Sequence, residues 1–144
     1  MATAGQPEDS PVDWVNDHIQ RYVSTDGASG YDWRGTSILL LTTTGRKTGT
    51  RRRTALIYRQ VGDAYVIVGS KGGHDHHPAW YLNLAADPDV TVQVRDEVFE
   101  GRARTTEGAE RARLWPLMAE VWPDYDKYRE RTDREIPVIA IERI

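Results

Sequence analysis

The sequence predicts an α+β domain, built mainly of antiparallel strands closed into a barrel or sandwich, with helices at its periphery. Its 144 residues, 39% of them hydrophobic, suit one ordinary domain with a substantial core. About six strand-like segments follow one another mostly as hairpins, and the helical stretches are appended to them rather than alternating with them. Closure of such a sheet hides its edges.

The N-terminal part is expected to be a tail, an amphipathic helix and a linker over residues 1–30, preceding a strand domain over 31–144. Ser10 and Pro11 predict the cap and first residue of a helix over 11–23. The apolar residues of that helix are spaced on one face. Residues 25–30, rich in glycine and small polar side chains, predict a flexible linker.

The strands are predicted from apolar runs and alternating patterns bounded by turn residues. Gly62-Asp63 and Asp96-Glu97 are typical of tight hairpin turns. The expected strands are 37–44, 54–61, 64–69, 90–94, 98–104 and 136–141.

The remaining helices are predicted from their start and stop residues. Pro78 opens a short helix that Pro88 must stop. Thr106 is expected to cap a longer helix, which Pro116 should kink or divide. A further helical stretch is expected over 124–131.

The charge is distributed unevenly along the chain. The whole sequence carries 19 Lys+Arg against 22 Asp+Glu, but five of the basic residues lie within 46–53, a segment without an acidic residue. A strand that ends in hydroxyls, turns on glycine and presents cations is typical of a phosphate or carboxylate site. The alternative is a solvated basic hairpin. The loop 69–73 adds a lysine beside two glycines, and both loops would face one ligand if the strands before them were neighbours.

Several functions are disfavoured by composition. The chain has no cysteine, which excludes a disulfide framework and Cys-ligated metal and suits a reducing compartment. The first ten residues lack the apolar region of a secretory signal, so a cytoplasmic protein is expected. The acidic remainder argues against nucleic acid. His74, His76 and His77 lack zinc-site spacing, so no metal is predicted.

No nucleophile triad or catalytic carboxylate pair emerges from the sequence. This favours a binding function, or an enzyme whose cofactor does the chemistry. Trp122, Tyr125 and Tyr128 recur every three residues near the C-terminus. They predict either core packing or the wall of a pocket for a planar, apolar substrate.

Four stretches together resemble the deazaflavin-dependent nitroreductase family of actinobacteria. They are LLLTTTGRKTG (39–49), VIVGSKGG (66–73), PAWYLNLAADPDVTVQV (78–94) and WPDYDKYRERTDREIPVIAI (122–141). The resemblance implies a split β-barrel related to FMN-binding oxidoreductases. It also implies the cofactor coenzyme F420, an 8-hydroxy-5-deazaflavin with a polyanionic phospholactyl-oligoglutamate tail.

The same resemblance assigns expected roles to individual residues. Trp122, Tyr125 and Tyr128 are expected in the substrate pocket. Ser70, Tyr125 and Tyr128 are the expected catalytic hydrogen-bond donors. The residues expected to bind the cofactor are Arg46, Lys47, Thr48, Arg53, Ser70, Lys71, Trp80 and Asn83.

The implied reaction is hydride transfer from C5 of the reduced deazaflavin to a quinone or nitroaromatic acceptor. Two alternatives remain open: an FMN-dependent oxidoreductase on the same fold, and a carrier that binds a flavin or deazaflavin without turnover. The helix at 11–23, with Trp14 and Val15, also suggests weak association with the surface of the cytoplasmic membrane. The oligomeric state is left open.

Overall fold

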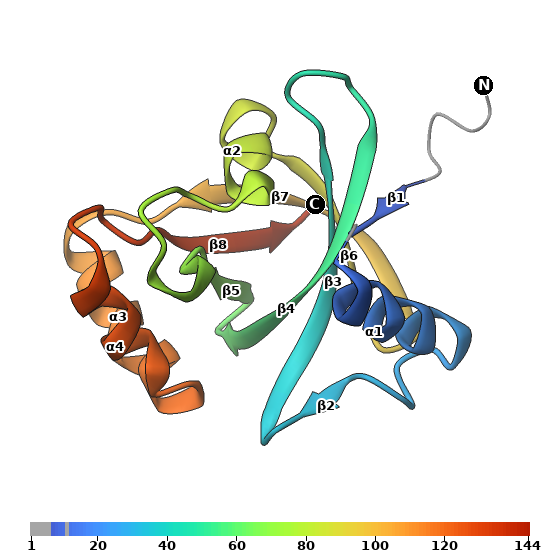
Figure 1. The fold of residues 1–144 in the computed structure, drawn as a ribbon, viewed down its shortest axis with the longest axis horizontal. Coiled ribbons are helices and arrows are strands. Elements are labelled where there is room, and N and C mark those ends of the chain that lie inside the picture. The colour runs from blue at the N-terminus through green and yellow to red at the C-terminus, as the bar shows by residue number, and fades with distance from the viewer. Residues whose placement is uncertain (1–6, 11) are drawn as a thin grey trace.

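The computed structural model describes residues 7–10 and 12–144, and its centre is a closed antiparallel β-barrel (Figure 1). Six strands form the barrel in the order β3-β4-β5-β8-β7-β6, and β6 pairs back onto β3. Their bounds are β3 Thr36–Thr44, β4 Arg51–Val61, β5 Ala64–Val68, β6 Asp89–Val94, β7 Glu97–Thr105 and β8 Val138–Arg143. The predicted barrel is thereby confirmed, and the sandwich is not formed.

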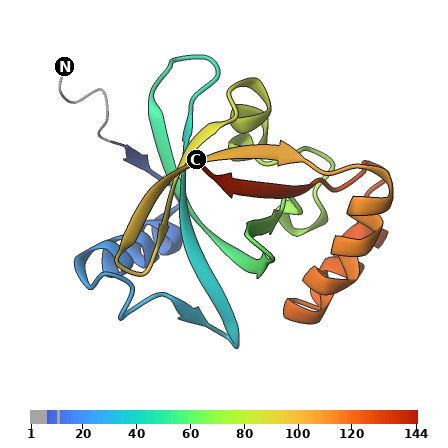
Figure 2. The same ribbon diagram turned by 180° about the vertical axis from the view of Figure 1, so that it is seen from behind.

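Two short strands and four α-helices surround the barrel. The strands are β1 (Glu8–Asp9) and β2 (Asp32–Trp33); the helices are α1 (Asp13–Ser24), α2 (Ala79–Ala86), α3 (Gly108–Val121) and α4 (Asp124–Arg131). A 3-10 turn, η2 (Lys71–Gly73), follows β5. The two opposite views show α1 on one side of the barrel and the α3–α4 pair on the other (Figures 1 and 2).

The core is divided between the barrel interior and the two helix-covered faces. Inside the barrel, Tyr58, Tyr65 and Phe99 pack with ring centroids 5.1–5.9 Å apart. On one face, Ile19 and Tyr22 of α1 cover outward residues of β3. On the other, α3 and α4 cover β5 and β8.

Several details of the predicted elements are wrong. Thr106 does not cap α3: that helix begins at Gly108, and the Thr106 hydroxyl instead donates to the Val138 carbonyl at 2.8 Å. Pro116 does not divide α3, which continues through it. The last strand begins two residues later than predicted, at Val138. The predicted Pro11 helix start lies outside the described residues, and α1 begins at Asp13.

The predicted linker is an ordered turn rather than a free chain. The Gly27 amide donates to the Tyr22 carbonyl at 2.9 Å. The Thr25 hydroxyl donates to the Arg21 carbonyl and accepts from the Ser29 amide. His18 Nε2 lies 2.6 Å from the Gly30 carbonyl. These bonds hold the chain between α1 and β2 against the end of α1.

The strands that precede the basic loop and the 69–73 loop are not neighbours. β4 lies between β3 and β5 and pairs antiparallel with both. Because β3 and β5 therefore run in the same direction, the loops at their C-terminal ends lie at the same end of the barrel. In residues 7–10 and 12–144, no helix is long and apolar enough to cross a membrane.

Candidate active site

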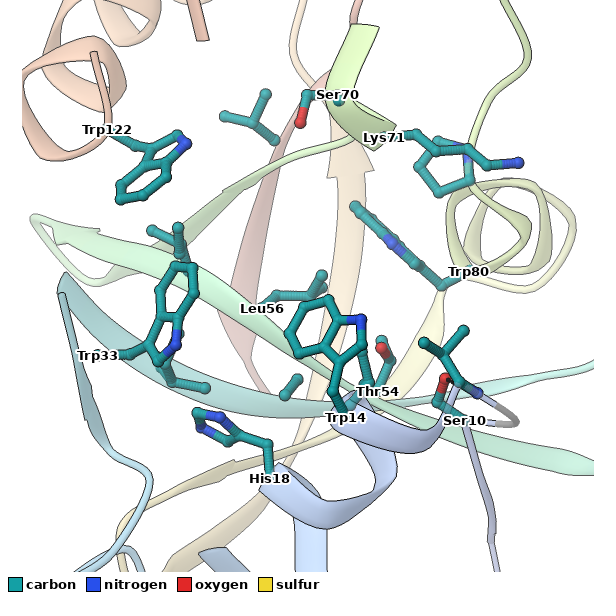
Figure 3. A pocket seen from close by; sticks show the side chains of 18 of the residues that line it. Ser10, Trp14, His18, Trp33, Thr54, Leu56, Ser70, Lys71, Trp80 and Trp122 are labelled. Atoms are coloured by element: carbon teal, nitrogen blue, oxygen red, sulfur yellow. Dashed lines mark hydrogen bonds between the residues drawn. The ribbon is translucent and has the colours of Figure 1, made fainter. Parts of the chain in front are cut away.

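A pocket of about 740 Å³ lies along β4, between α1 on one side and α4 on the other (Figure 3). Its polar lining includes Ser70, Thr54 and Ser10, and its apolar lining comes from β4, α1 and α2. This volume lies in the range of sites for small molecules and cofactors.

Indole rings form most of the pocket wall. Four of the five tryptophans line it: Trp14, Trp33, Trp80 and Trp122. Trp33 and Trp122 pack together with centroids 5.4 Å apart, and Trp80 stands across the pocket from them (Figure 3). Flat apolar walls of this kind favour a flat aromatic ligand.

The loop after β5 borders the pocket with a strained backbone. Ser70 is buried in a right-handed helical conformation, whereas Lys71 has a φ of +45°. This succession turns backbone N–H groups toward a common point, an arrangement that binds anionic oxygens. The conformation is costly for a lysine, so contacts elsewhere must hold it.

Arg134 holds this loop from behind. Its guanidinium donates to the carbonyls of Gly69, Ser70 and His74 at 3.2, 2.7 and 2.6 Å. It also lies 3.2 Å from Nδ1 of His77. Burial, and then the neighbouring Arg134, lower the pKa of His77. A neutral imidazole is therefore favoured beside this guanidinium.

The three predicted aromatic residues of the C-terminal part all line the pocket. Tyr125 is only 5% exposed and also packs in the core under α3, so core packing and pocket lining are both correct for it. Burial raises the pKa of Tyr125, which keeps its hydroxyl protonated. The Tyr128 hydroxyl accepts a hydrogen bond from Trp122 Nε1 at 3.3 Å.

A smaller hollow of about 160 Å³ adjoins the pocket. The two share Ser10, Thr54, Ala79 and Trp80 in their linings. Asn83 lies at the base of this hollow, and its Oδ1 accepts from the backbone N–H and the guanidinium of Arg46 at 3.2 and 3.0 Å. The predicted residues Trp80, Asn83 and Arg46 are thus brought together.

The basic segment is only partly free. Arg51 donates to Thr44 and Thr91, while Arg53 is paired with Asp9. Lys47 and Thr48 lie at the exposed tip of the β3–β4 loop, outside the linings of both hollows. The structure therefore spreads the predicted cations over the β3–β4 loop and the start of β4, and it does not gather them in one cluster.

Sequence reasoning missed the partners of these cations and half of the indole wall. The missed acidic residues, Glu8 and Asp9, come from a tail that has no periodic pattern. Trp14 and Trp33 come from α1 and from a two-residue strand.

Comparisons with known proteins find a family and relatives that this chain resembles. The family model described as F420H(2)-dependent quinone reductase matches residues 14–143. The F420H(2)-dependent quinone reductase Rv1261c of Mycobacterium tuberculosis is 42% identical over 130 residues, which cover 88% of this chain and 87% of the relative.

Two solved structures are similar over most of the chain. One, described as an F420-H2 dependent reductase (FDR-A), is 44% identical, with a TM-score of 0.68 over 76% of this chain and 95% of that chain. Another, described as a domain-swapped dimer, is 42% identical, with a TM-score of 0.71 over 92% and 100%. The predicted split barrel, F420 cofactor and reductase activity are thereby confirmed at the level of the family. With a family model that spans nearly the whole chain, this protein belongs to the F420H(2)-dependent quinone reductases.

Proposed function

We propose that the indole-walled pocket holds the deazaflavin ring of reduced coenzyme F420 beside a quinone, with the cofactor tail directed toward the smaller hollow. One observation carries the proposal: an aromatic pocket shares part of its lining with a smaller hollow that Arg52, Arg53 and Asn83 also line. A planar ring with a polyanionic tail needs both parts in this order.

The residues present fit this cofactor. Trp80 offers a flat face to the ring system, and the loop at Ser70 and Lys71 offers N–H groups to its polar edge. Arg46, bonded to Asn83, and Lys47, exposed next to it in the chain, are the cations proposed for the tail. The roles predicted for Ser70, Lys71, Trp80 and Asn83 are therefore retained in the proposal.

Bound in this way, the reduced cofactor supplies a hydride to an electron-poor acceptor. The protein itself places the two reactants in contact and excludes water with its indole walls. Negative charge grows on the oxygen of the acceptor during the transfer. The hydroxyls of Tyr125 and Ser70, both residues of the pocket lining, are the donors proposed for it.

The proposal is tested by titrating the purified protein with F420, FMN and NADPH, followed by turnover with menadione and a nitroaromatic acceptor. We expect micromolar or tighter binding of F420 and oxidation of the reduced cofactor by menadione. Purification with bound FMN would favour the FMN-dependent alternative. Binding of F420 without turnover would favour the carrier.

The tail contact is tested by Lys47→Ala. Loss of one cation near a polyanion is expected to weaken F420 binding and to flatten its dependence on salt concentration. Lys127→Ala, which removes an exposed lysine on α4, is the matched control. Equal affinity of the Lys47→Ala variant and the wild type at all salt concentrations would remove Lys47 from the tail site.

A further inference from the structure

The arginines that face the proposed tail site are already covered by two carboxylates of the same chain. Strand β1 runs parallel to β4, with Glu8 opposite Arg52 and Asp9 opposite Arg53. Glu8 lies 3.1 Å from the Arg52 guanidinium. Asp9 receives two hydrogen bonds from Arg53, at 2.6 and 3.1 Å.

The Asp9 pair is the better shielded of the two. The side chains of Arg53 and Asp9 are 19% and 13% exposed, against 47% and 58% for Arg52 and Glu8. Gln20 of α1 adds a hydrogen bond to Asp9 Oδ2 at 2.6 Å. A carboxylate held by a forked guanidinium has the geometry that a phosphate or a glutamate of the cofactor tail would adopt there.

β1 is held by little else. It is two residues long, and no residue from 7 to 10 belongs to the described apolar clusters. Its attachment therefore consists of polar contacts: ion pairs and backbone pairing with β4, and hydrogen bonds from Gln20 and Asn16 of α1 to Asp9 and Ser10. Elements with few buried apolar contacts open at low free-energy cost.

We propose that Glu8 and Asp9 are specificity-determining residues that compete with the anionic tail of the cofactor for Arg52 and Arg53. Both carboxylates line the smaller hollow together with the two arginines, so an incoming anion meets them directly. Tail binding then requires β1 to leave β4. The inference rests on the proposed function, because the tail must occupy this end of the site.

The test compares F420 with its tail-less chromophore, the 8-hydroxy-5-deazaflavin that ends at the ribityl chain. We expect the dissociation constant of F420 to be about three- to tenfold lower for the Glu8→Gln/Asp9→Asn variant than for the wild type. A gain of this size is expected when the tail site is open in only a minor fraction of the wild-type molecules. The dissociation constant of the tail-less chromophore should stay unchanged.

The matched control is Asp63→Asn/Asp96→Asn, which removes the same charge from two exposed hairpin turns. It should leave both dissociation constants within about twofold of the wild type, since distant surface charges are screened. Circular dichroism of every variant confirms that the fold is retained.

Three binding results would overturn the inference. The Glu8→Gln/Asp9→Asn variant could bind F420 with the wild-type dissociation constant, it could bind F420 more weakly than the wild type, or it could gain equal affinity for the tail-less chromophore. Hydrogen exchange supplies a readout independent of mutation. F420 should accelerate exchange of the backbone amides of Glu8 and Asp9 in the wild type, and slower exchange there would also overturn the inference. If the wild type failed to bind F420 at all, the proposed function itself would be wrong.

Discussion

At the residue scale, Tyr125 combines burial with access to the pocket, so its hydroxyl keeps its proton at a place where it can donate. The pKa of Tyr125 is raised by burial, and then by the neighbouring Tyr128. A phenol whose pKa is raised stays protonated above the pH at which a free tyrosine ionises, so it keeps its proton for donation.

We therefore expect Tyr125→Phe to lower kcat for quinone reduction by about tenfold or more, as for loss of one donor to developing negative charge. The affinity for F420 should change little, because the ring of the phenylalanine keeps the packing under α3. Steady-state kinetics with menadione measure this.

Two further results bear on Tyr125. In the wild type, kcat should show no decline from tyrosine ionisation up to about pH 10. Tyr128→Phe is the comparison: the Tyr128 hydroxyl accepts from Trp122 Nε1 and keeps its own proton, so an equal loss of kcat in this variant would show that the donation does not belong to Tyr125 alone. A Tyr125→Phe enzyme with wild-type kcat would assign the donation to Ser70 or to water.

The residues of the site differ in how far the sequence could predict them. Trp80, Asn83 and Ser70 lie in motifs next to clear element boundaries, and the structure brings them to one region. Glu8 and Asp9 could not be predicted, because an ion pair between residues more than forty positions apart leaves no local pattern. The +5 charge of the basic segment therefore overstated the free charge at the site.

At the scale of elements, the loop after β5 depends on the segment that follows α4. Arg134 donates hydrogen bonds to three carbonyl oxygens of the loop. Gly73 packs so closely on α4 that an added Cβ would lie 2.8 Å from the Tyr128 carbonyl oxygen. The left-handed conformation of Lys71 is thus imposed from outside the loop.

We expect Arg134→Ala to weaken F420 binding by about fivefold or more, because three loop carbonyls lose a charged donor and the loop relaxes. Arg134→Lys should restore little, since an ammonium lacks the fork that reaches several carbonyls. Fluorescence titration measures the affinity, and guanidinium ion added to Arg134→Ala should recover part of it.

Arg129→Ala is the control for Arg134→Ala, because Arg129 lies on α4 with a side chain 52% exposed and pairs with Asp126. A similar loss of affinity in both variants would indicate a general charge effect. The result would then exclude a positioning role for Arg134.

The regular elements were predictable where they are long and periodic. Hairpin patterns located β6 and β7, and α4 matches its predicted range of 124–131. The two-residue strands β1 and β2 were not, because their pairing depends on partners elsewhere in the fold. Thr106 was assigned wrongly because the carbonyl of Val138, distant in sequence, competes successfully for its hydroxyl.

For the whole molecule, α1 is fastened to the barrel and also forms one wall of the pocket. Ile19 and Tyr22 are completely buried against β3. The Tyr22 hydroxyl donates to the Ile38 carbonyl at 3.0 Å and accepts from the Arg95 amide at 2.7 Å. Trp14 and His18, on the same helix, line the pocket.

These contacts predict that α1 and the barrel unfold together, although the sequence separates residues 1–30 from 31–144. Ile19→Ala should lower the free energy of unfolding by about 2–5 kcal/mol, the cost of a cavity in a packed core. Val12→Ala, at a side chain 48% exposed, should change it by about 0.5 kcal/mol or less. Urea unfolding, followed by tryptophan fluorescence and far-ultraviolet circular dichroism, measures both variants. Coincident transitions that shift together in Ile19→Ala indicate one cooperative unit. A barrel transition that stays in place while helical signal is lost at lower urea would show that α1 is an independent appendage.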